Sequence, residues 1–447
     1  MSDNRKKLIK NKSTATSQLM LFSFLLLILL GALLLMLPAA SADGTATPFE
    51  DTLFTAVSAT CVTGLVTVDT ATHWSMFGQA IILLLIQIGG MGVVTVAMFA
   101  VMVSGKKIGL RQRSTMQESI SAPQVGGIVK LLGFIITGSL TVELIGAALL
   151  MPVFIKDFGA VGIWYAFFHS ISAFCNAGFD LMGVRSPFSS LTSYADNAYV
   201  GVVIMLLIVI GGIGFLTWND VKTNKFRLRK YSLQSKIILS VSAVLILVPA
   251  VLFFIFEYKG EPFGVRMLHA FFQSVTTRTA GFNTTDLSQL TDAGKAVMTV
   301  LMLIGGSPGS TAGGMKTTTV AVLLFAAISV FRRRDDAEAF GRRFPESALR
   351  TAGAILFMYL SLSISAGAVI SLIEGLPITE CLFETSSAVG TVGLTLGITP
   401  ALSLPSKIIL MVLMYLGRVG GLTLIYAALP SQIDTDAKLP QEKLTVG

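Results

Sequence analysis

The chain has 447 residues, of which 53% are hydrophobic and 13% are charged, and its mean hydropathy is +0.76. This composition excludes a soluble globular protein and predicts an integral membrane protein. The net charge of +8 requires no nucleic-acid partner, because basic loops beside an anionic lipid bilayer explain it.

The first apolar run, residues 19–37, follows Arg5-Lys6-Lys7 and precedes Ala40-Ser41-Ala42. The same arrangement occurs in cleaved signal peptides, whose apolar region has about 7–15 residues. The run in this chain is longer than that. We therefore interpret it as a membrane span that is retained.

Eight apolar segments are long enough to cross a membrane, since a spanning helix needs about 20 residues. The sixth is too long for one span and is interrupted by glycines. The eight segments are 19–38, 78–104, 130–152, 199–218, 236–256, 295–331, 350–373 and 407–429.

Most of the 33 lysines and arginines lie in four connections, at 5–12, 106–130, 222–236 and 332–350. Because translocation disfavours these residues, the connections are predicted to be cytoplasmic. An even number of spans then places both termini, including a tail over 431–447, in the cytoplasm. The expected location is the cell membrane.

One fragment occurs four times: a Phe, a short polar stretch and, ten residues after the Phe, a glycine followed by Leu or Phe. The stretches before the glycines predict short pore helices. Irregular backbone at membrane depth is tolerated only inside protein or beside water, and glycine lets carbonyl groups adopt otherwise strained orientations. Such carbonyls replace the water around a dehydrated cation. The alternative is that these glycines serve close helix packing. Their recurrence at the same position in four loops argues against this alternative. The fragments run from Phe54 to Gly64, Phe168 to Gly178, Phe271 to Gly281 and Phe383 to Gly393.

We therefore predict an all-α integral membrane fold with four parallel helix–pore-loop–helix pseudo-repeats, and eight spanning helices, around a central ion pore. Residues 1–447 form a single transmembrane pore domain. The repeats are expected at about 15–110, 125–222, 232–334 and 346–430.

The expected selectivity filter binds potassium through backbone carbonyls, with one segment from each loop. The candidate ion-binding residues are Thr60, Cys61, Val62, Thr63 and Gly64; Cys175, Asn176, Ala177 and Gly178; Arg278, Thr279, Ala280 and Gly281; and Gly390, Thr391, Val392 and Gly393. Arg278 is expected to brace the filter from behind, against Glu384 or Glu380.

The interruption of the sixth span predicts a gate. Glycine costs about 1 kcal/mol and proline about 3 kcal/mol relative to alanine in a helix, so this segment must unwind in mid-membrane. A nucleotide-binding P-loop is excluded, because the interval from Gly309 to Lys316 does not fit its spacing. The candidate gate residues are Gly305, Gly306, Ser307, Pro308, Gly309, Ser310, Thr311, Ala312, Gly313 and Gly314, together with Lys316.

Arg418 completes the candidate gate. It lies within an apolar span, and the interval from Gly393 to Gly417 equals that from Gly281 to Gly305. A central arginine costs roughly 2.5–3.5 kcal/mol on insertion scales, so such residues usually face a bundle interior or a watery cavity. We expect it to repel cations or to anchor the loop. Lys316 is read equally as a part of the gate or as an anchor at the cytoplasmic side.

These motifs resemble the Trk/Ktr/HKT superfamily of potassium transporters, in particular the bacterial Ktr-type membrane subunit. The motifs are Thr60-Cys61-Val62-Thr63-Gly64-Leu65, Phe174-Cys175-Asn176-Ala177-Gly178-Phe179, Thr277-Arg278-Thr279-Ala280-Gly281-Phe282 and Val389-Gly390-Thr391-Val392-Gly393-Leu394.

The resemblance implies potassium uptake in a bacterium, with four filter glycines favouring potassium over sodium. It also implies an intramembrane gate loop with an arginine, a homodimer, and a cytosolic ring of nucleotide-binding regulatory subunits. The resemblance implies no covalently bound cofactor. It also implies that sodium stimulates transport.

Two other classes of function fit the sequence less well. A sodium-permeable or ion-coupled carrier of another class predicts inverted repeats and carboxylates at the midplane, whereas these repeats run parallel and their filter segments lack acids. An intramembrane enzyme needs a catalytic set, but H-E-x-x-H is absent and no span holds an Asp pair. We therefore predict a gated, channel-like subunit for potassium uptake and no enzyme.

Overall fold

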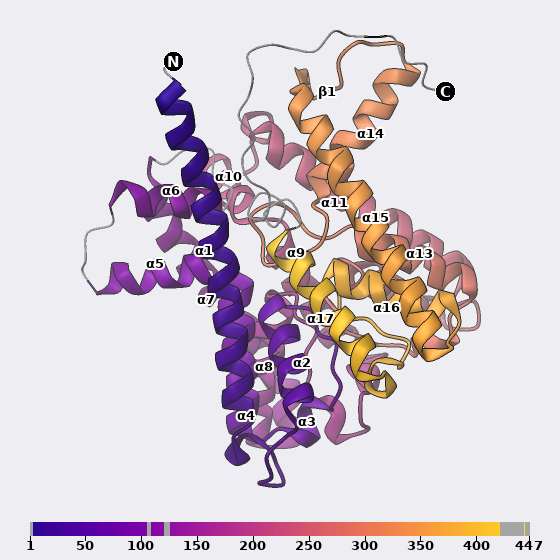
Figure 1. Cartoon of the computed structure of the whole chain (residues 1–447). Helices are drawn as coiled ribbons and strands as arrows, with labels where there is room; N and C mark the ends of the chain where they lie inside the picture. Colours follow the sequence, from indigo (N-terminus) through magenta and orange to yellow (C-terminus); the bar gives the residue numbers. More distant parts are fainter. Residues whose placement is uncertain (1–2, 105–108, 120–125, 421–441, 443–447) are drawn as a thin grey trace.

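The computed structural model describes residues 3–104, 109–119, 126–420 and 442, and these residues are almost entirely helical (Figure 1). Each predicted repeat contains a long helix, a short helix, an extended loop and a further helix. Repeat 1 comprises α1 (Asp3–Leu35), η1 (Pro38–Ala40), α2 (Phe49–Cys61), α3 (Thr70–His73), α4 (Met76–Met91) and α5 (Val93–Val103), and α6 (Leu110–Ser119) follows it.

Repeat 2 has the same order of elements. It comprises α7 (Ile128–Phe158), α8 (Val161–Phe174), η2 (Met182–Val184), η3 (Thr192–Tyr194), α9 (Ala198–Gly212) and α10 (Phe215–Asn224), and η4 (Leu228–Lys230) follows it.

Repeats 3 and 4 complete the chain. Repeat 3 comprises α11 (Leu233–Phe256), α12 (Phe263–Thr276), η5 (Leu287–Gln289), α13 (Asp292–Leu303) and α14 (Thr317–Phe331); repeat 4 comprises α15 (Glu346–Glu374), α16 (Ile378–Gly390), η6 (Thr399–Ala401) and α17 (Leu404–Val419). A small antiparallel hairpin of β1 (Glu338–Ala339) and β2 (Arg342–Arg343) joins them.

The repeats close into a circle. Within each repeat the long helix packs on the short one, as α1 does on α2 and α7 on α8. Between repeats, the helix after the loop packs on the short helix of the next repeat: α4 on α8, α9 on α12, α13 on α16, and α17 back on α2. This cyclic order is what four parallel units around one axis require.

The long helices are apolar on their outer faces, as lipid contact requires. Three of the described helices, α7, α11 and α15, are each long and apolar enough to cross a membrane. On α11, for example, Leu247 and Val251 are more than half exposed. These helices correspond to the predicted spans at 130–152, 236–256 and 350–373.

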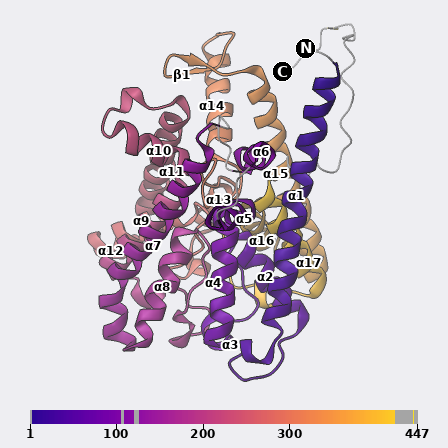
Figure 2. The ribbon, with the colours of Figure 1, turned by 90° about the vertical axis from the view of Figure 1, so that its left-hand side faces the viewer.

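Two predicted spans are not straight helices. Segment 78–104 is divided into α4 and α5, bent by 93°, and segment 199–218 into α9 and α10, bent by 95°. Figures 1 and 2 show α5 leaving the end of α4 sideways. The bends occur at Gly92 (φ +86°) and Gly214 (φ +90°), a conformation that interrupts a helix and that side chains oppose.

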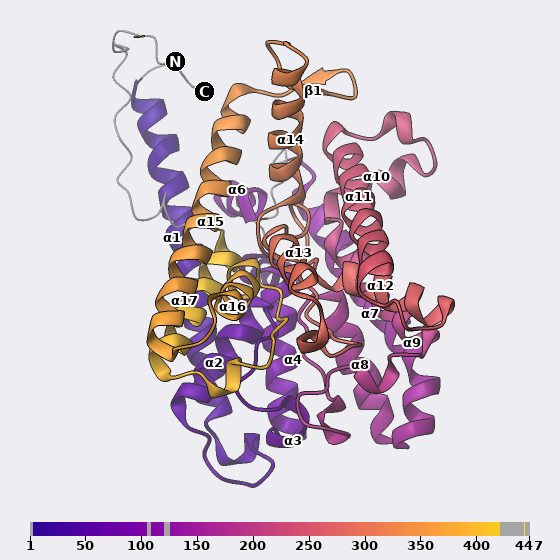
Figure 3. The ribbon, with the colours of Figure 1, turned by 90° about the vertical axis from the view of Figure 1, so that its right-hand side faces the viewer.

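The sixth predicted span is interrupted as expected, between α13 and α14, and α14 rises toward the β1–β2 hairpin (Figure 3). The last predicted span, 407–429, begins in α17. Its part from 421 onward and most of the 431–447 tail lie outside the described residues.

Candidate functional site

The four loops share one backbone conformation. Two residues before each repeated glycine, a residue other than glycine adopts a left-handed conformation, and the glycine itself has a φ between +70° and +96°. Left-handed residues other than glycine are uncommon, so their recurrence at one position indicates a common structure. The left-handed residues are Val62, Asn176, Thr279 and Thr391, and the glycines, which we call the glycine ring, are Gly64, Gly178, Gly281 and Gly393.

The loops meet one another in cyclic order. A Cβ added to Gly64 would lie 2.5 Å from the carbonyl oxygen of Ala177, and one added to Gly178 would lie 2.9 Å from that of Ala280. The same construction on Gly281 reaches the carbonyl oxygen of Val392 at 2.5 Å, and on Gly393 it collides with that of Thr63. Each glycine therefore lies against the residue that precedes the glycine of the next repeat, and the circle closes.

A hydroxyl group at the end of each short helix supports its loop. Ser58 Oγ and Ser387 Oγ each accept a hydrogen bond, at 3.1 Å, from the amide of the glycine six residues later. Ser172 Oγ donates to the Phe179 carbonyl at 2.6 Å, and Thr276 Oγ1 donates to the Phe282 carbonyl at 2.7 Å. These bonds hold the backbone at the ring glycine itself or at the residue that follows it.

Repeat 3 departs from the predicted register. The buried aromatic residue behind its loop is Phe272, which is 1% exposed, and Phe271 is only partly buried. Its supporting hydroxyl, Thr276, lies five residues before Gly281, whereas the other repeats use the sixth. The equal spacing of Phe271 and its counterparts was therefore a misleading signal, because the interval from the supporting hydroxyl to the ring glycine is one residue shorter in this repeat.

We expect Ser387→Ala to destabilise the protein, because the buried amide of Gly393 loses its acceptor. An unsatisfied buried donor costs about 1–3 kcal/mol, and the melting temperature of the purified protein in detergent measures the loss. Ser365→Ala is the control, since that exposed hydroxyl donates only within its own helix, to the Ser361 and Leu362 carbonyls. Equal melting temperatures for the two variants would contradict the assignment.

The glycine-rich loop between α13 and α14 packs against the loops that carry the glycine ring. Its base is closed by hydrogen bonds from the Gly305 amide to the Met315 carbonyl (2.8 Å) and from the Thr317 amide to the Gly306 carbonyl (3.0 Å). A Cβ on Gly313 would collide with Thr391 Oγ1 of repeat 4. This loop, over 305–314, therefore contacts the filter segment of that repeat directly.

The same loop also reaches repeat 2. Thr311 Oγ1 lies 3.0 Å from both the Phe174 carbonyl oxygen and Asn176 Oδ1. The Ser307 amide donates to the Gly212 carbonyl at 3.0 Å, and the Phe215 amide donates to the Gly309 carbonyl at 2.7 Å. The loop is thus bound on opposite sides, by repeats 2 and 4.

Two cations hold the loop through its carbonyl groups. Arg418 donates to the Thr311 carbonyl and, at 2.5 and 2.9 Å, to the carbonyls of Gly89 and Gly90. Lys316 Nζ donates to the Ala312 carbonyl at 2.8 Å. Across the described residues, no carboxylate forms an ion pair with either side chain. Arg418 therefore bonds the loop to repeat 1, and Lys316 lies on the loop itself.

The position of Arg418 has a counterpart in every repeat. At or directly after the ends of the helices that follow the glycine ring lie Ile88-Gly89-Gly90, Ile210-Gly211-Gly212, Ile304-Gly305-Gly306 and Leu416-Gly417-Arg418. Arg418 replaces the second glycine of this pair. The equal intervals noted above match Gly305 with Gly417, but Gly211 lies at a longer interval from its ring glycine and was missed.

The predicted bracing of Arg278 by an acid is wrong. Arg278 is 7% exposed, and its Nη1 has no hydrogen-bond partner among the described residues. Glu384 instead accepts hydrogen bonds from Thr395 Oγ1, at 2.9 Å, and from Thr399 Oγ1. The Glu384 carboxylate thus faces the loop that follows the ring glycine in its own repeat. The short sequence separation between Glu384 and these threonines favours this contact.

A cavity of about 320 Å³ lies on the other side of the glycine ring from the glycine-rich loop. Its walls include Val66, Asn283 and Thr395, each two residues after a ring glycine. Asp286 also lines it, and hydrogen bonds from the hydroxyl and the amide of Ser288 lower the pKa of that carboxyl. The mouth of the ring therefore carries a stable negative charge, which attracts cations.

The chain resembles proteins of one transport family. The model of the TrkH family, described as a cation transport protein, matches residues 2–437. The potassium/sodium uptake protein NtpJ of Enterococcus hirae is 41% identical over 98% of both chains, and the Ktr system potassium uptake protein B of Bacillus subtilis is 38% identical over 96% of both.

A solved structure has the same fold. The crystal structure of the potassium transporter TrkH from Vibrio parahaemolyticus aligns with a TM-score of 0.70, over 91% of this chain and 84% of that one. At 18% sequence identity, this likeness concerns the fold alone.

Proposed function

The chain belongs to the TrkH family of cation transport proteins, and from this premise we propose that it is the pore subunit of a potassium uptake system in a bacterial cell membrane. It is a multi-pass membrane protein for cation uptake and not an enzyme. The observation that carries the proposal is the closed circle of four glycine loops.

The proposed selectivity filter is the wall of the glycine ring. Main-chain carbonyls from 60–64, 175–178, 278–281 and 390–393 replace the hydration shell of a potassium ion, as carbonyl rings do in other cation pores. The positive φ of all four glycines supports this role, since it orients the backbone in a way that a side chain would oppose. No acid lies in these segments. The dipoles of the carbonyl groups, and not a carboxylate charge, therefore offset the hydration that the ion loses.

The proposed gate is the loop 305–314 with Lys316 and Arg418. In the conformation described, the loop is hydrogen-bonded to repeat 2 and to Arg418 of repeat 4, which also bonds repeat 1, and it lies directly against the filter segment at Thr391. An arginine bound to one carbonyl of this loop both anchors it and opposes cations electrostatically. Opening requires these bonds to break.

The assembly is proposed from the family resemblance. It comprises a homodimer on a cytosolic ring of nucleotide-binding regulatory subunits, with both termini cytoplasmic. The basic connections support this orientation, since α6, α10 and the β1–β2 hairpin lie at the same end of the molecule (Figure 1). The four repeats form one transmembrane pore domain, and sodium is proposed to stimulate transport without any covalent cofactor.

Sodium permeation is the second candidate function. The name of the NtpJ relative, a potassium/sodium uptake protein, favours it. Each loop contributes a single ring glycine, and the αL positions differ among repeats, from Val62 to Asn176. A filter built from four different segments discriminates less sharply between alkali ions than a filter built from four identical segments.

The proposed function is tested by expressing the chain with a matched regulatory subunit in a bacterium that lacks its own potassium uptake. We expect growth to be restored at low potassium, and rubidium uptake to be inhibited more strongly by potassium than by sodium. Absence of rescue, with the protein present in the membrane, would refute potassium uptake. Equal inhibition by the two ions would support sodium permeation.

A further inference from the structure

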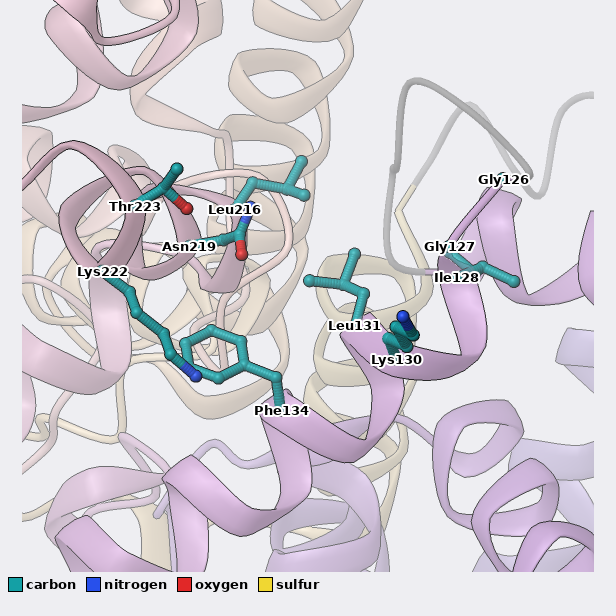
Figure 4. Close-up of a pocket in the computed structure, with 10 residues that line it drawn as sticks. All are labelled: Gly126, Gly127, Ile128, Lys130, Leu131, Phe134, Leu216, Asn219, Lys222 and Thr223. Carbon is teal, nitrogen blue, oxygen red and sulfur yellow. The ribbon is translucent and has the colours of Figure 1, made fainter.

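A second cavity, of about 640 Å³, lies far from the glycine ring, between the first two turns of α7 and one face of α10. Its apolar walls are Leu131 and Phe134 of α7 and Leu216 of α10 (Figure 4). Positions 216, 219 and 223 share one face of α10, and 127, 131 and 134 share one face of α7, by helical spacing. Two facing helices thus form a groove, which we call the α7–α10 groove.

The polar side chains that line the α7–α10 groove include no acid. Lys130 and Lys222 line it, together with Asn219 and Thr223. Lys222 Nζ lies 4.6 Å from the centroid of the Phe134 ring (Figure 4). Within the described part of the chain neither lysine forms an ion pair. The nearest acid in α10, Asp220, is instead bonded to Ser232 and Ser235 at 2.7 Å. The groove therefore carries two uncompensated positive charges.

The groove lies at the level where a membrane-spanning helix begins. Ile128–Phe158 is one of the candidate spans, and Lys130 lies in its first turn. Beyond the groove, Ile145 and Leu149, which share the face of Leu131 by helical spacing, are 55% and 43% exposed. Phe226, just after α10, is 99% exposed, which suits an interfacial position rather than water. The groove thus opens onto a lipid-facing surface.

From this geometry we infer that the α7–α10 groove binds an anionic phospholipid. Lys222, with Asn219 and Thr223, binds the phosphate of the headgroup, and Lys130, which Figure 4 shows on the other side of Leu131, adds to the positive potential that attracts the anionic lipid. Leu131, Phe134 and Leu216 contact the adjoining glycerol and acyl carbons, and the exposed Ile145 and Leu149 of α7 continue the apolar path. Basic pockets between membrane helices recognise such headgroups. The apolar walls favour a lipid over a free phosphate ion.

The inference depends on the membrane position of α7 and not on the proposed filter, gate or orientation. Its test is therefore a binding measurement. The purified full-length chain in detergent is titrated with phosphatidylglycerol, or with phosphatidylcholine of the same acyl chains, and lipid occupancy is read by native mass spectrometry. We expect phosphatidylglycerol to bind roughly 25-fold more tightly, because each of two lysines contributes about fivefold.

The double variant Lys130→Gln/Lys222→Gln is expected to lose this preference. A lysine near an anionic headgroup contributes about fivefold in affinity, so the double variant should bind phosphatidylglycerol roughly 25-fold more weakly. Lys225→Gln/Lys230→Gln is the matched control, since both are exposed lysines with the same charge, beyond the groove. Its affinity should equal that of the unmodified chain.

Several results would overturn the inference. They are an unchanged affinity in the groove variant, an equal loss in the control, and an equal affinity for the two lipids. Full displacement of phosphatidylglycerol by millimolar inorganic phosphate would identify a free-anion site instead. Melting temperatures of all variants show whether each is folded. A filter variant such as Gly64→Ser should keep its lipid binding, so failure of the proposed function and failure of this inference are distinguishable.

Discussion

Gly64→Ser is expected to reduce potassium uptake at least tenfold. The added Cβ would lie 2.5 Å from the Ala177 carbonyl oxygen and 3.1 Å from the Cα of Gly178. It would also impose a side chain at φ +96°. A left-handed conformation costs about 1–2 kcal/mol and overpacking about 1–3 kcal/mol. Either the loop of repeat 1 moves out of the ring, or the carbonyl of repeat 2 does. In both cases an ion loses a ligand.

Rubidium uptake in the potassium-deficient strain measures this effect, with equal amounts of protein in the membrane. Gly44→Ser is the matched control: Gly44 also has a positive φ, of +71°, but a Cβ there would meet no atom within 4 Å. It should retain uptake. Normal uptake by Gly64→Ser would contradict the filter, and equal losses in both variants would attribute the effect to backbone strain alone.

Arg418→Gln is expected to raise flux in the absence of the regulatory subunit by about tenfold to a hundredfold. The guanidinium donates to three carbonyls, one in the glycine-rich loop and two at the end of α4. A hydrogen bond to a charged group contributes about 1.5–3 kcal/mol, and 1.4 kcal/mol changes an equilibrium tenfold. Loss of these bonds therefore shifts the loop toward its open conformation and removes a positive charge from the path.

Rubidium flux into proteoliposomes that contain the chain alone measures the leak. Lys407→Gln is the control on the same helix, since Lys407 lies 3.8 Å from Asp51, at the other end of α17 from the loop. Its flux should stay low. A flux for Arg418→Gln that is unchanged or lower would remove the arginine from the gate.

The repeats could be predicted from the sequence because their signals are local. Phe54 and Gly64, with their counterparts, mark a short helix and the turn that ends it, and both depend on neighbouring residues. The interruption at 305–314 was equally visible, since five glycines and a proline cannot remain helical.

Other features depend on contacts that no local pattern carries. The bends at Gly92 and Gly214 leave the apolar run unbroken, so hydropathy does not detect them. The shift in repeat 3 was hidden because Phe271 and Phe272 are adjacent and only packing distinguishes them. The position of Arg418 against Gly89 and Gly90 joins residues more than 300 positions apart. Its equivalence to the second glycine of each pair was present in the sequence and was missed.

The central claim is that main-chain oxygens of the four loops bind a dehydrated cation together. The most direct measurement is anomalous diffraction from crystals of the protein soaked in thallium, which substitutes for potassium. We predict a peak on the axis, within coordination distance of the carbonyl oxygens of Thr63, Ala177, Ala280 and Val392. A well-ordered ring without a thallium peak, with the metal bound only elsewhere, would contradict the account.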